Sequence, residues 1–588
     1  MEKKYLLGNE AIAYGLYEGG VTASFAYPGT PSSEITETLI EISQEDIYVE
    51  WSINEKVAFE NAYGVSLTGR RSCVIMKHVG LNVASDSLLT SAYTGIAGGF
   101  LIIVADDPYA HSSQNEQDSR RYAQFAKIVC FEPSTIQEAK DIIIFAFDFS
   151  EKYQIPVLIR SVTRLSHGKS DVLIGKRKEK KEVSDFIKNP SQFVMVPSNA
   201  RRAIINLNKK LTVIKRNVEK LKINKIQKGE GITGIVASGL SYVYVKEFLK
   251  LTGKSLPLIK IGSYPVPEKK LGKFLSGLKT VFVFEEGDPV TEEFVYICSK
   301  KYNLELKIKG KMSGDVKKEG ELSVEDIAYS FSRKKKTTYI NINLPERTPF
   351  LCPGCPHTGS FYILKKVFEK ESIFPGDIGC YTLGIKLGTI DTCLCMGSGI
   401  SIGTGISRFD KRYVISIIGD STFFHAGIPG LINAVYNQSN QVIAILDNRT
   451  TAMTGYQPHP GTGINAKGNK TVEIDLKKLI EGCGVKNLVE VDPYSIKDSI
   501  EKIKQIKEKE GVKVIIFKRE CIHISDFKKP AYFIDKDICR KCKLCLEIGC
   551  PSINLVNDSI EINIFCSGCG MCEQICPFSA IKKNEKEI

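Results

Sequence analysis

The sequence predicts an α/β protein with several doubly wound parallel-sheet domains and one small C-terminal domain of a different kind. Short apolar runs alternate with helical patterns through most of the chain, which is typical of βα units on parallel sheets. The 588 residues are enough for about three to five domains. Eight of the 18 cysteines lie between Cys539 and Cys576, so the end of the chain needs a separate account.

The first expected domain covers residues 1–170. Its apolar runs 72–76, 100–106 and 155–160 are rich in β-branched residues, and we expect them to be buried parallel strands. The lysine-rich stretch that follows predicts a linker with surface helices over residues 171–230.

Two further α/β patterns follow in the chain. A middle domain is expected at 231–335, with strands in GITGIVASG, SLPLIKIG and KTVFVFEEG. A third domain is expected at 345–525, with strands 413–420, 441–448 and 512–520. Residues 528–588 form the cysteine-rich tail.

Composition excludes some classes of protein. No uninterrupted apolar stretch reaches about 20 residues, and the N-terminus lacks the apolar core of a signal peptide, so we expect a cytoplasmic protein. Cysteines in such a chain indicate metal or redox chemistry rather than disulfides. The net charge of +13 fits a solvated lysine-rich surface, or the steering of an acidic protein partner. No nucleic-acid motif accompanies the lysines.

The cysteine tail has the spacing of a bacterial two-cluster ferredoxin. Two CxxCxxC runs are each followed by a Cys-Pro, and the last cysteine of each run is expected to reach the other cluster. A zinc ribbon needs only four cysteines per site and does not explain this repeat. The predicted [4Fe–4S] ligand sets are Cys539, Cys542, Cys545 and Cys576 for one cluster, and Cys566, Cys569, Cys572 and Cys550 for the other.

A second constellation lies in the third domain. Gly419-Asp420-Ser421 ends one expected strand and Asn448 follows the next, 28 positions after Asp420. A carboxylate, an amide oxygen and the backbone carbonyl of Thr450 are suitable Mg²⁺ ligands. The glycine-rich segment with Gly397 and Gly399 would allow close approach to a phosphate group. The alternative is an ordinary strand-end turn.

This spacing resembles the thiamine-diphosphate signature, with Ser421 where glycine is usual. A thiamine enzyme also needs a glutamate beside the aminopyrimidine ring. Glu55, in Asn54-Glu55-Lys56-Val57-Ala58, resembles that glutamate, and the alternative is a solvated helix residue. We therefore expect a pyrimidine-binding first domain and a diphosphate-binding third domain.

Further segments resemble the alpha subunit of the indolepyruvate:ferredoxin oxidoreductases, a branch of the thiamine-diphosphate-dependent 2-oxoacid:ferredoxin oxidoreductase family. They are YPGTPSS (27–33), MKHVGLNVASD (76–86), CPGCPH (352–357), DTCLCMGSGIS (391–401) and LDNRTTAMTGYQPHPG (446–461). The resemblance covers nearly the whole chain.

The resemblance implies oxidative decarboxylation of an aryl pyruvate such as indolepyruvate, with coenzyme A as acyl acceptor and ferredoxin as electron acceptor. It also implies thiamine diphosphate, Mg²⁺, a smaller beta subunit and an α2β2 assembly. It places Thr30 near the substrate carboxylate, and His78 is a candidate donor to the substrate, against the alternative of a packed loop histidine. Cysteines at corresponding places in relatives hold another cluster, so a candidate third set is Cys352, Cys355, Cys380 and Cys521; the alternative is structural thiols.

Two other functions compete with this one. An electron-transfer subunit would explain the tail but not the combination of Asp420, Asn448 and Glu55. A thiamine enzyme without redox output, such as a non-oxidative decarboxylase, stays open, and dye reduction that depends on both a 2-oxo acid and coenzyme A would exclude it.

Overall fold

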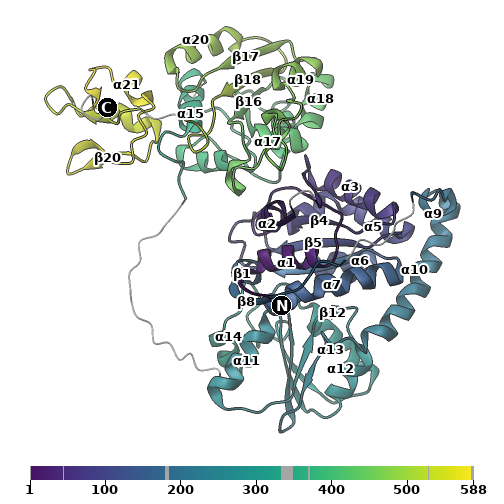
Figure 1. Cartoon of the computed structure of the whole chain (residues 1–588). Coiled ribbons are helices and arrows are strands. Elements are labelled where there is room, and N and C mark those ends of the chain that lie inside the picture. Colours follow the sequence, from purple (N-terminus) through teal and green to yellow (C-terminus); the bar gives the residue numbers. More distant parts are fainter. Residues whose placement is uncertain are drawn as a thin grey trace. The chain divides into compact units, whose positions relative to one another are not determined.

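The computed structural model describes residues 2–43, 46–178, 185–332, 349–368, 371–526 and 529–584 (Figure 1). The chain divides into two units, Met1–Asn341 and Ile342–Ile588. In the part of the chain that is described, no helix combines the length and the apolar character that crossing a membrane requires.

The first unit contains a seven-stranded sheet in the order β12-β6-β7-β5-β4-β2-β3. All neighbours are parallel except β12 and β6. The strands are β2 (Ala23–Ala26), β3 (Tyr48–Trp51), β4 (Ser72–Lys77), β5 (Phe100–Asp106), β6 (Val129–Phe131), β7 (Val157–Val162) and β12 (Ser263–Tyr264). The three strands predicted in the first domain are thus present as β4, β5 and β7.

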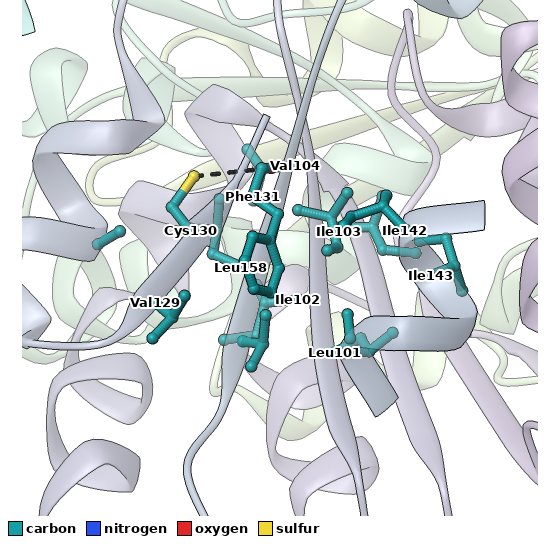
Figure 2. Packing of buried hydrophobic residues seen from close by; sticks show 14 of the residues in the cluster. Leu101, Ile102, Ile103, Val104, Val129, Cys130, Phe131, Ile142, Ile143 and Leu158 are labelled. Atoms are coloured by element: carbon teal, nitrogen blue, oxygen red, sulfur yellow. Dashed lines mark hydrogen bonds between the residues drawn. The ribbon is translucent and has the colours of Figure 1, made fainter. Parts of the chain in front are cut away.

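Strand β5 is apolar along its whole length because it is buried at every position. Figure 2 shows Leu101, Ile103 and Val104 of β5 packed near Phe131 of β6 and Leu158 of β7, with Ile142 and Ile143 of helix α7 (Ile136–Tyr153) beside them. This core fixes the ends of the parallel strands, where the polar residues of the unit gather.

A separate two-stranded sheet is formed by β8 (Lys169–Ile174), which follows the seven-stranded sheet's β7 in the chain and pairs antiparallel with β1 (Glu2–Leu7). The helices α9 (Pro190–Phe193) and α10 (Pro197–Val218) follow, and Leu207, Ile214 and Val218 of α10 are buried. The surface helices predicted here therefore include one long helix with a packed face.

A second sheet in the unit has the order β14-β13-β10-β11-β9. Its strands are β9 (Ile226–Gln227), β10 (Thr233–Ser238), β11 (Leu258–Ile261), β13 (Thr280–Phe284) and β14 (Lys307–Lys309), and only β9 is antiparallel to its neighbour. The predicted strands of the middle domain correspond to β10, β11 and β13.

The second unit contains a parallel sheet in the order β15-β16-β18-β17. The strands are β15 (Ile415–Gly419), β16 (Val442–Asp447), β17 (Asn487–Val491) and β18 (Lys513–Lys518). Helices α15 (Pro356–Val367), α16 (Ser398–Ile406), α18 (Ile428–Tyr436), α19 (Leu476–Gly482) and α20 (Ile496–Lys507) accompany it.

The tail of the second unit is built differently. Two antiparallel pairs, β19 (Tyr532–Ile534) with β22 (Ile581–Lys583) and β20 (Ile553–Val556) with β21 (Ser559–Ile562), flank the short helix α21 (Met571–Ile575). The predicted fold class, parallel α/β sheets followed by a small α+β domain, is confirmed.

Candidate functional site

The tips of β15 and β16 bring the predicted diphosphate residues together. The two strands are parallel neighbours, with Gly419 opposite Leu446, so Asp420 and Asn448 emerge at the same edge of the sheet. Asp420 is buried and accepts hydrogen bonds from the backbone amides of Ser421 (2.9 Å) and Arg449 (2.8 Å). Nε2 of His459 lies 3.0 Å from Asp420 Oδ2.

The amide of Asn448 lies against two oxygen atoms at this edge. In the orientation that satisfies its hydrogen bonds, its nitrogen donates to the carbonyl of Thr450 (2.8 Å) and to Asp420 Oδ1 (3.1 Å). Rotation of the amide would bring its oxygen to the same position, beside the other two, as a cation ligand. Adjacent ligands of an octahedral Mg²⁺ ion are about 3 Å apart, given Mg–O distances of about 2.1 Å. The donor set and its spacing therefore fit Mg²⁺.

The electrostatics of the edge also favour a cation. Burial raises the pKa of Asp447 to about 7, and the charge of Asp420 acts in the same direction. Burial opposes ionisation of Asp420 as well, but the charge of His459 and its hydrogen bond lower the pKa of Asp420. Two buried carboxyl groups in contact cannot both ionise cheaply without a positive partner.

Gly419 is required here by a neighbouring ring. A Cβ atom at this position would lie 2.6 Å from Cε1 of Tyr381. The hydroxyl of Tyr381 donates to the carbonyl of Ile378 (2.8 Å) and contacts Oγ1 of Thr422 (3.1 Å). Ser421 is held by Thr451, whose Oγ1 lies 2.8 Å from the Ser421 hydroxyl oxygen. The glycine thus lets Tyr381 brace the start of the Asp420 loop.

Asp377 is a residue that sequence reasoning missed. Its buried carboxylate accepts hydrogen bonds from the amides of Gly397 (2.9 Å) and Gly399 (3.2 Å), at the start of α16. Burial raises the pKa of Asp377 to about 7, although these amides act against the shift. The two predicted glycine amides are therefore occupied by Asp377 in this structure. The short stretch Gly376-Asp377 before a glycine-rich helix start was the only available signal.

The other predicted residues lie in the first unit. Glu55 is buried at the start of α3 (Glu55–Leu67) and packs against Gly80, where a Cβ atom would be 2.6 Å from Glu55 Oε1. Thr30 lies in the 27–33 loop, and its carbonyl accepts a hydrogen bond from the Ser112 hydroxyl (3.2 Å). His78 is 1% exposed, and its Nε2 lies 3.2 Å from the carbonyl oxygen of Asn115.

The tail cysteines line two separate cavities. One is lined by Cys539, Cys542, Cys545 and Cys576, and the other by Cys550, Cys566, Cys569 and Cys572. These groupings match the two predicted ligand sets, including the exchange of the fourth cysteine between runs. Among the described residues, no three Cys, His, Asp or Glu side chains form a group close enough to bind a single metal ion.

The four remaining predicted cysteines also converge. Burial raises the pKa of the Cys355 thiol, and the charges of Cys380, Cys352 and Cys521 raise it further. Nε2 of His523 lies 3.2 Å from the sulfur of Cys352. The amide of Cys521 donates to the carbonyl of Asn448 (3.0 Å), so this cysteine set adjoins the Asp420 edge directly.

Gly354 connects the same set to the tail. It lies between Cys352 and Cys355 in sequence and lines the cavity of Cys550, Cys566, Cys569 and Cys572. Its φ is +72°, and a Cβ atom there would be 1.9 Å from the Ser567 hydroxyl oxygen. Only a glycine allows this loop to approach the tail so closely.

Three family models match the chain. The model "Pyruvate flavodoxin/ferredoxin oxidoreductase, thiamine diP-bdg" matches residues 14–228, and "Thiamine pyrophosphate enzyme, C-terminal TPP binding domain" matches residues 377–517. The "4Fe-4S binding domain" model matches residues 565–582. The chain thus carries thiamine-diphosphate-binding and iron–sulfur-binding domains.

Several curated proteins are similar over nearly their whole length. The indolepyruvate oxidoreductase subunit IorA of Archaeoglobus fulgidus is 41% identical, covering 99% of this chain and 97% of its own. The subunit of the same name from Thermococcus kodakarensis is 40% identical, with coverages of 99% and 97%. That of Methanothermobacter marburgensis is 41% identical, with coverages of 100% and 98%. The chain therefore belongs to the indolepyruvate oxidoreductase subunit IorA family.

Proposed function

We propose that this chain, with a smaller partner subunit, oxidatively decarboxylates an aryl pyruvate, transferring the acyl group to coenzyme A and the electrons to ferredoxin. The observation that carries the proposal is the hydrogen bond between Cys521 and Asn448. It joins the Asp420, Asn448 and Thr450 site to the cysteines that lead to the tail. A cation site for a diphosphate and a path for electrons thus lie within one unit. An assembly of two large and two small subunits is part of the proposal.

Asp420, Asn448 and the carbonyl of Thr450 are proposed to hold Mg²⁺, which neutralises the diphosphate of the cofactor. Supporting this are the spacings of 2.8 and 3.1 Å between the Asn448 amide and the oxygens of Thr450 and Asp420. The buried Asp420–Asp447 pair also has no salt bridge to an arginine or lysine side chain within the described residues. His459 orients Asp420 through their hydrogen bond. When bound, thiamine diphosphate supplies the acidic thiazolium carbon and the electron sink for loss of carbon dioxide.

Glu55 is proposed to hold or release a proton at the pyrimidine ring. Its burial beside Gly80 supports this role, because a carboxyl group shielded from water is held for proton transfer with a bound partner. Thr30 is proposed to contact the substrate, and His78 remains a candidate donor, although its Nε2 is directed at Asn115.

Cys352, Cys355, Cys380 and Cys521 are proposed to hold a third iron–sulfur cluster, which would supply one-electron transfer between the Asp420 edge and the tail. The convergence of four thiols supports it, since thiols that raise one another's pKa ionise readily only with a cation present. From there, electrons would pass beside Gly354 to the cluster at Cys550, Cys566, Cys569 and Cys572, and then to the cluster at the other tail cysteines.

The function is tested by anaerobic co-expression with the partner subunit and side-by-side assays with indolepyruvate, phenylpyruvate and pyruvate. We expect dye reduction that requires both an aryl pyruvate and coenzyme A. Reduction that does not depend on the 2-oxo acid would favour an electron carrier. Decarboxylation without dye reduction would favour a non-oxidative decarboxylase.

The third cluster is tested by iron content and low-temperature electron paramagnetic resonance of the Cys355→Ser enzyme. We expect about four iron atoms per chain to be lost, while both tail clusters remain. Cys483→Ser, at the end of α19 and away from the four thiols, is the matched control. Equal iron content in Cys355→Ser and the parent enzyme would reject the assignment.

A further inference from the structure

The proposed reaction places a carboxylate, that of the 2-oxo acid, inside a partly buried site. A carboxylate leaves water at a large cost unless a cation or several donors receive it. We propose that Lys77 is the cation that binds the carboxylate of the 2-oxo acid. This inference rests on the proposed function.

Lys77 contacts both the 27–33 loop and the 107–118 loop, near Glu55. It is the last residue of β4, and its side chain runs along Gly29, where a Cβ atom would be 3.1 Å from both Cγ and Cδ of Lys77. Its ammonium donates to the carbonyl of Ser112 (2.9 Å), and the hydroxyl of Ser112 donates to the carbonyl of Thr30 (3.2 Å). The lysine therefore lies where the 27–33 loop meets the 107–118 loop.

The ammonium of Lys77 has no direct carboxylate partner among the residues that the structure describes. Three buried cations of the same unit, Arg120, Arg160 and Lys140, each contact carboxylates, unlike the partly buried Lys77. The nearby Asp107 is already engaged by four donors: the Ser112 amide (2.8 Å), the Ser112 hydroxyl (3.3 Å), the Ser113 hydroxyl (2.7 Å) and the Thr163 hydroxyl (2.6 Å). Two of the three ammonium hydrogens thus remain for an incoming anion.

The charges that act on Lys77 come from Asp107 and Glu55. Burial lowers the pKa of Lys77 to about 8, although both carboxylates act against this shift. A partly desolvated ammonium gains more from a carboxylate than a hydrated one does. Because the lysine is charged only below its pKa, binding of the carboxylate should weaken as the pH rises through about 8.

The kinetic test uses the anaerobically purified two-subunit enzyme carrying Lys77→Met or Lys77→Arg. We expect Lys77→Met to raise the KM for indolepyruvate by about 10- to 100-fold, the range for a lost charged hydrogen bond, without changing the KM for coenzyme A. Lys77→Arg should restore part of the loss. Lys3→Met, an exposed lysine paired with Asp171 in the same unit, is the matched control.

A binding test separates recognition of the carboxylate from a merely structural role. Calorimetric titration with indole-3-propionate and with its uncharged amide should show that Lys77→Met weakens only the carboxylate. In the parent enzyme the affinity for the carboxylate should also fall above pH 8. Equal weakening of both ligands, or of neither, would overturn the inference. Absence of aryl pyruvate turnover by the parent enzyme would instead reject the proposed function, and the titrations would still decide the role of Lys77.

Discussion

Two groups of buried carboxylates in this molecule differ in the partners that balance their charge. In the first unit, Asp118 and Glu285 contact Arg120, and Asp106 contacts Arg160, with distances of 2.5, 2.8 and 2.6 Å. In the second unit, Asp420 and Asp447 contact each other, and their nearest polar partners include His459 and backbone amides. The first group is neutralised by arginine side chains. The second contacts a histidine but forms no arginine or lysine salt bridge among the described residues, which suits a site that binds a cation.

The arginine network links the two sheets of the first unit. Arg120 also donates to the Tyr264 hydroxyl (2.9 Å) and to the carbonyls of Glu286 and Asp288 (both 2.9 Å). Arg160 contacts Glu132, which follows β6, and donates to the carbonyl of Glu286, which follows β13. A buried charge is thus used to fix the carboxyl ends of two sheets against each other. Perturbed carboxylates alone therefore do not mark a binding site. The absence of an arginine or lysine salt bridge, among the residues that the structure describes, is the more informative feature.

The largest expected effect on stability comes from removing Arg120, which neutralises the carboxylates of the first group. Arg120→Met should lower the free energy of unfolding by about 3–5 kcal/mol, because it leaves buried carboxylates without a partner. Urea unfolding of the holoenzyme measures this effect. The control, Arg121→Met, removes a half-exposed arginine paired with Glu293 and should cost less than about 1 kcal/mol. Equal losses in both variants would contradict the distinction.

The second prediction concerns the Asp420–Asp447 pair and its proposed Mg²⁺ ion. Asp420→Asn should weaken Mg²⁺-dependent binding of thiamine diphosphate by at least about 100-fold, since even the hydrogen-bond partners of metal ligands contribute 10- to 100-fold. Its stability without Mg²⁺ should not fall, because a repulsive contact with Asp447 is removed. Calorimetry with and without Mg²⁺ tests both statements. Asp410→Asn, a carboxylate on the surface, is the control, and unchanged cofactor affinity in Asp420→Asn would rule out the Mg²⁺ assignment.

The third prediction concerns the contact between Gly419 and the Tyr381 ring, next to Asp420. Gly419→Ala places a methyl group against the Tyr381 ring and should cost about 1–3 kcal/mol of stability, as overpacking does. The cofactor affinity should fall with it, since the Asp420 loop is displaced. Adding Tyr381→Leu should recover part of both losses. If the double variant is no better than Gly419→Ala, a clash with Tyr381 is not the reason that glycine is needed.

The last prediction concerns the pH dependence of stability that Glu286 causes next to the arginine network. Burial raises the pKa of Glu286 to about 7, against the hydrogen bond from the Leu322 amide. The folded protein then binds a proton more readily than the unfolded chain between about pH 4.5 and 7, so stability falls as the pH rises through this window. Glu286→Gln should remove this pH dependence, which is at most about 3 kcal/mol for a shift from 4.5 to about 7. Unfolding curves at pH 5 and 8 measure it, and identical pH slopes in both proteins would refute the assignment.

Much of the fold was predictable because its signals are local. The runs that form β5 and β16 are apolar at nearly every position, as strands covered on both faces must be. The long α10 was less predictable, since a lysine-rich sequence with a sparse apolar stripe resembles a solvated linker. The packed face of α10 becomes recognisable only when Leu207, Ile214 and Val218 are seen against neighbouring elements.

The candidate site divides in the same way. Spacing alone predicted which tail cysteines share a cavity, because ligand runs of a ferredoxin are short and repeat. It also predicted that Asp420 and Asn448 meet, since both follow parallel strands. The engagement of the Gly397 and Gly399 amides by Asp377 could not be predicted, because it joins residues about 20 positions apart across an irregular loop.

The sequence by itself determined the order of the α/β units, the grouping of the tail cysteines and the Gly-Asp to Asn spacing, because each depends on residues that are close in the chain or on a regular strand repeat. The tertiary structure decided which buried charges are neutralised internally and which are not. It also decided that Cys521 adjoins Asn448 and that Lys77 lies against Gly29. These facts depend on how parallel strands and their loops bring together residues tens of positions apart, and no local pattern encodes them.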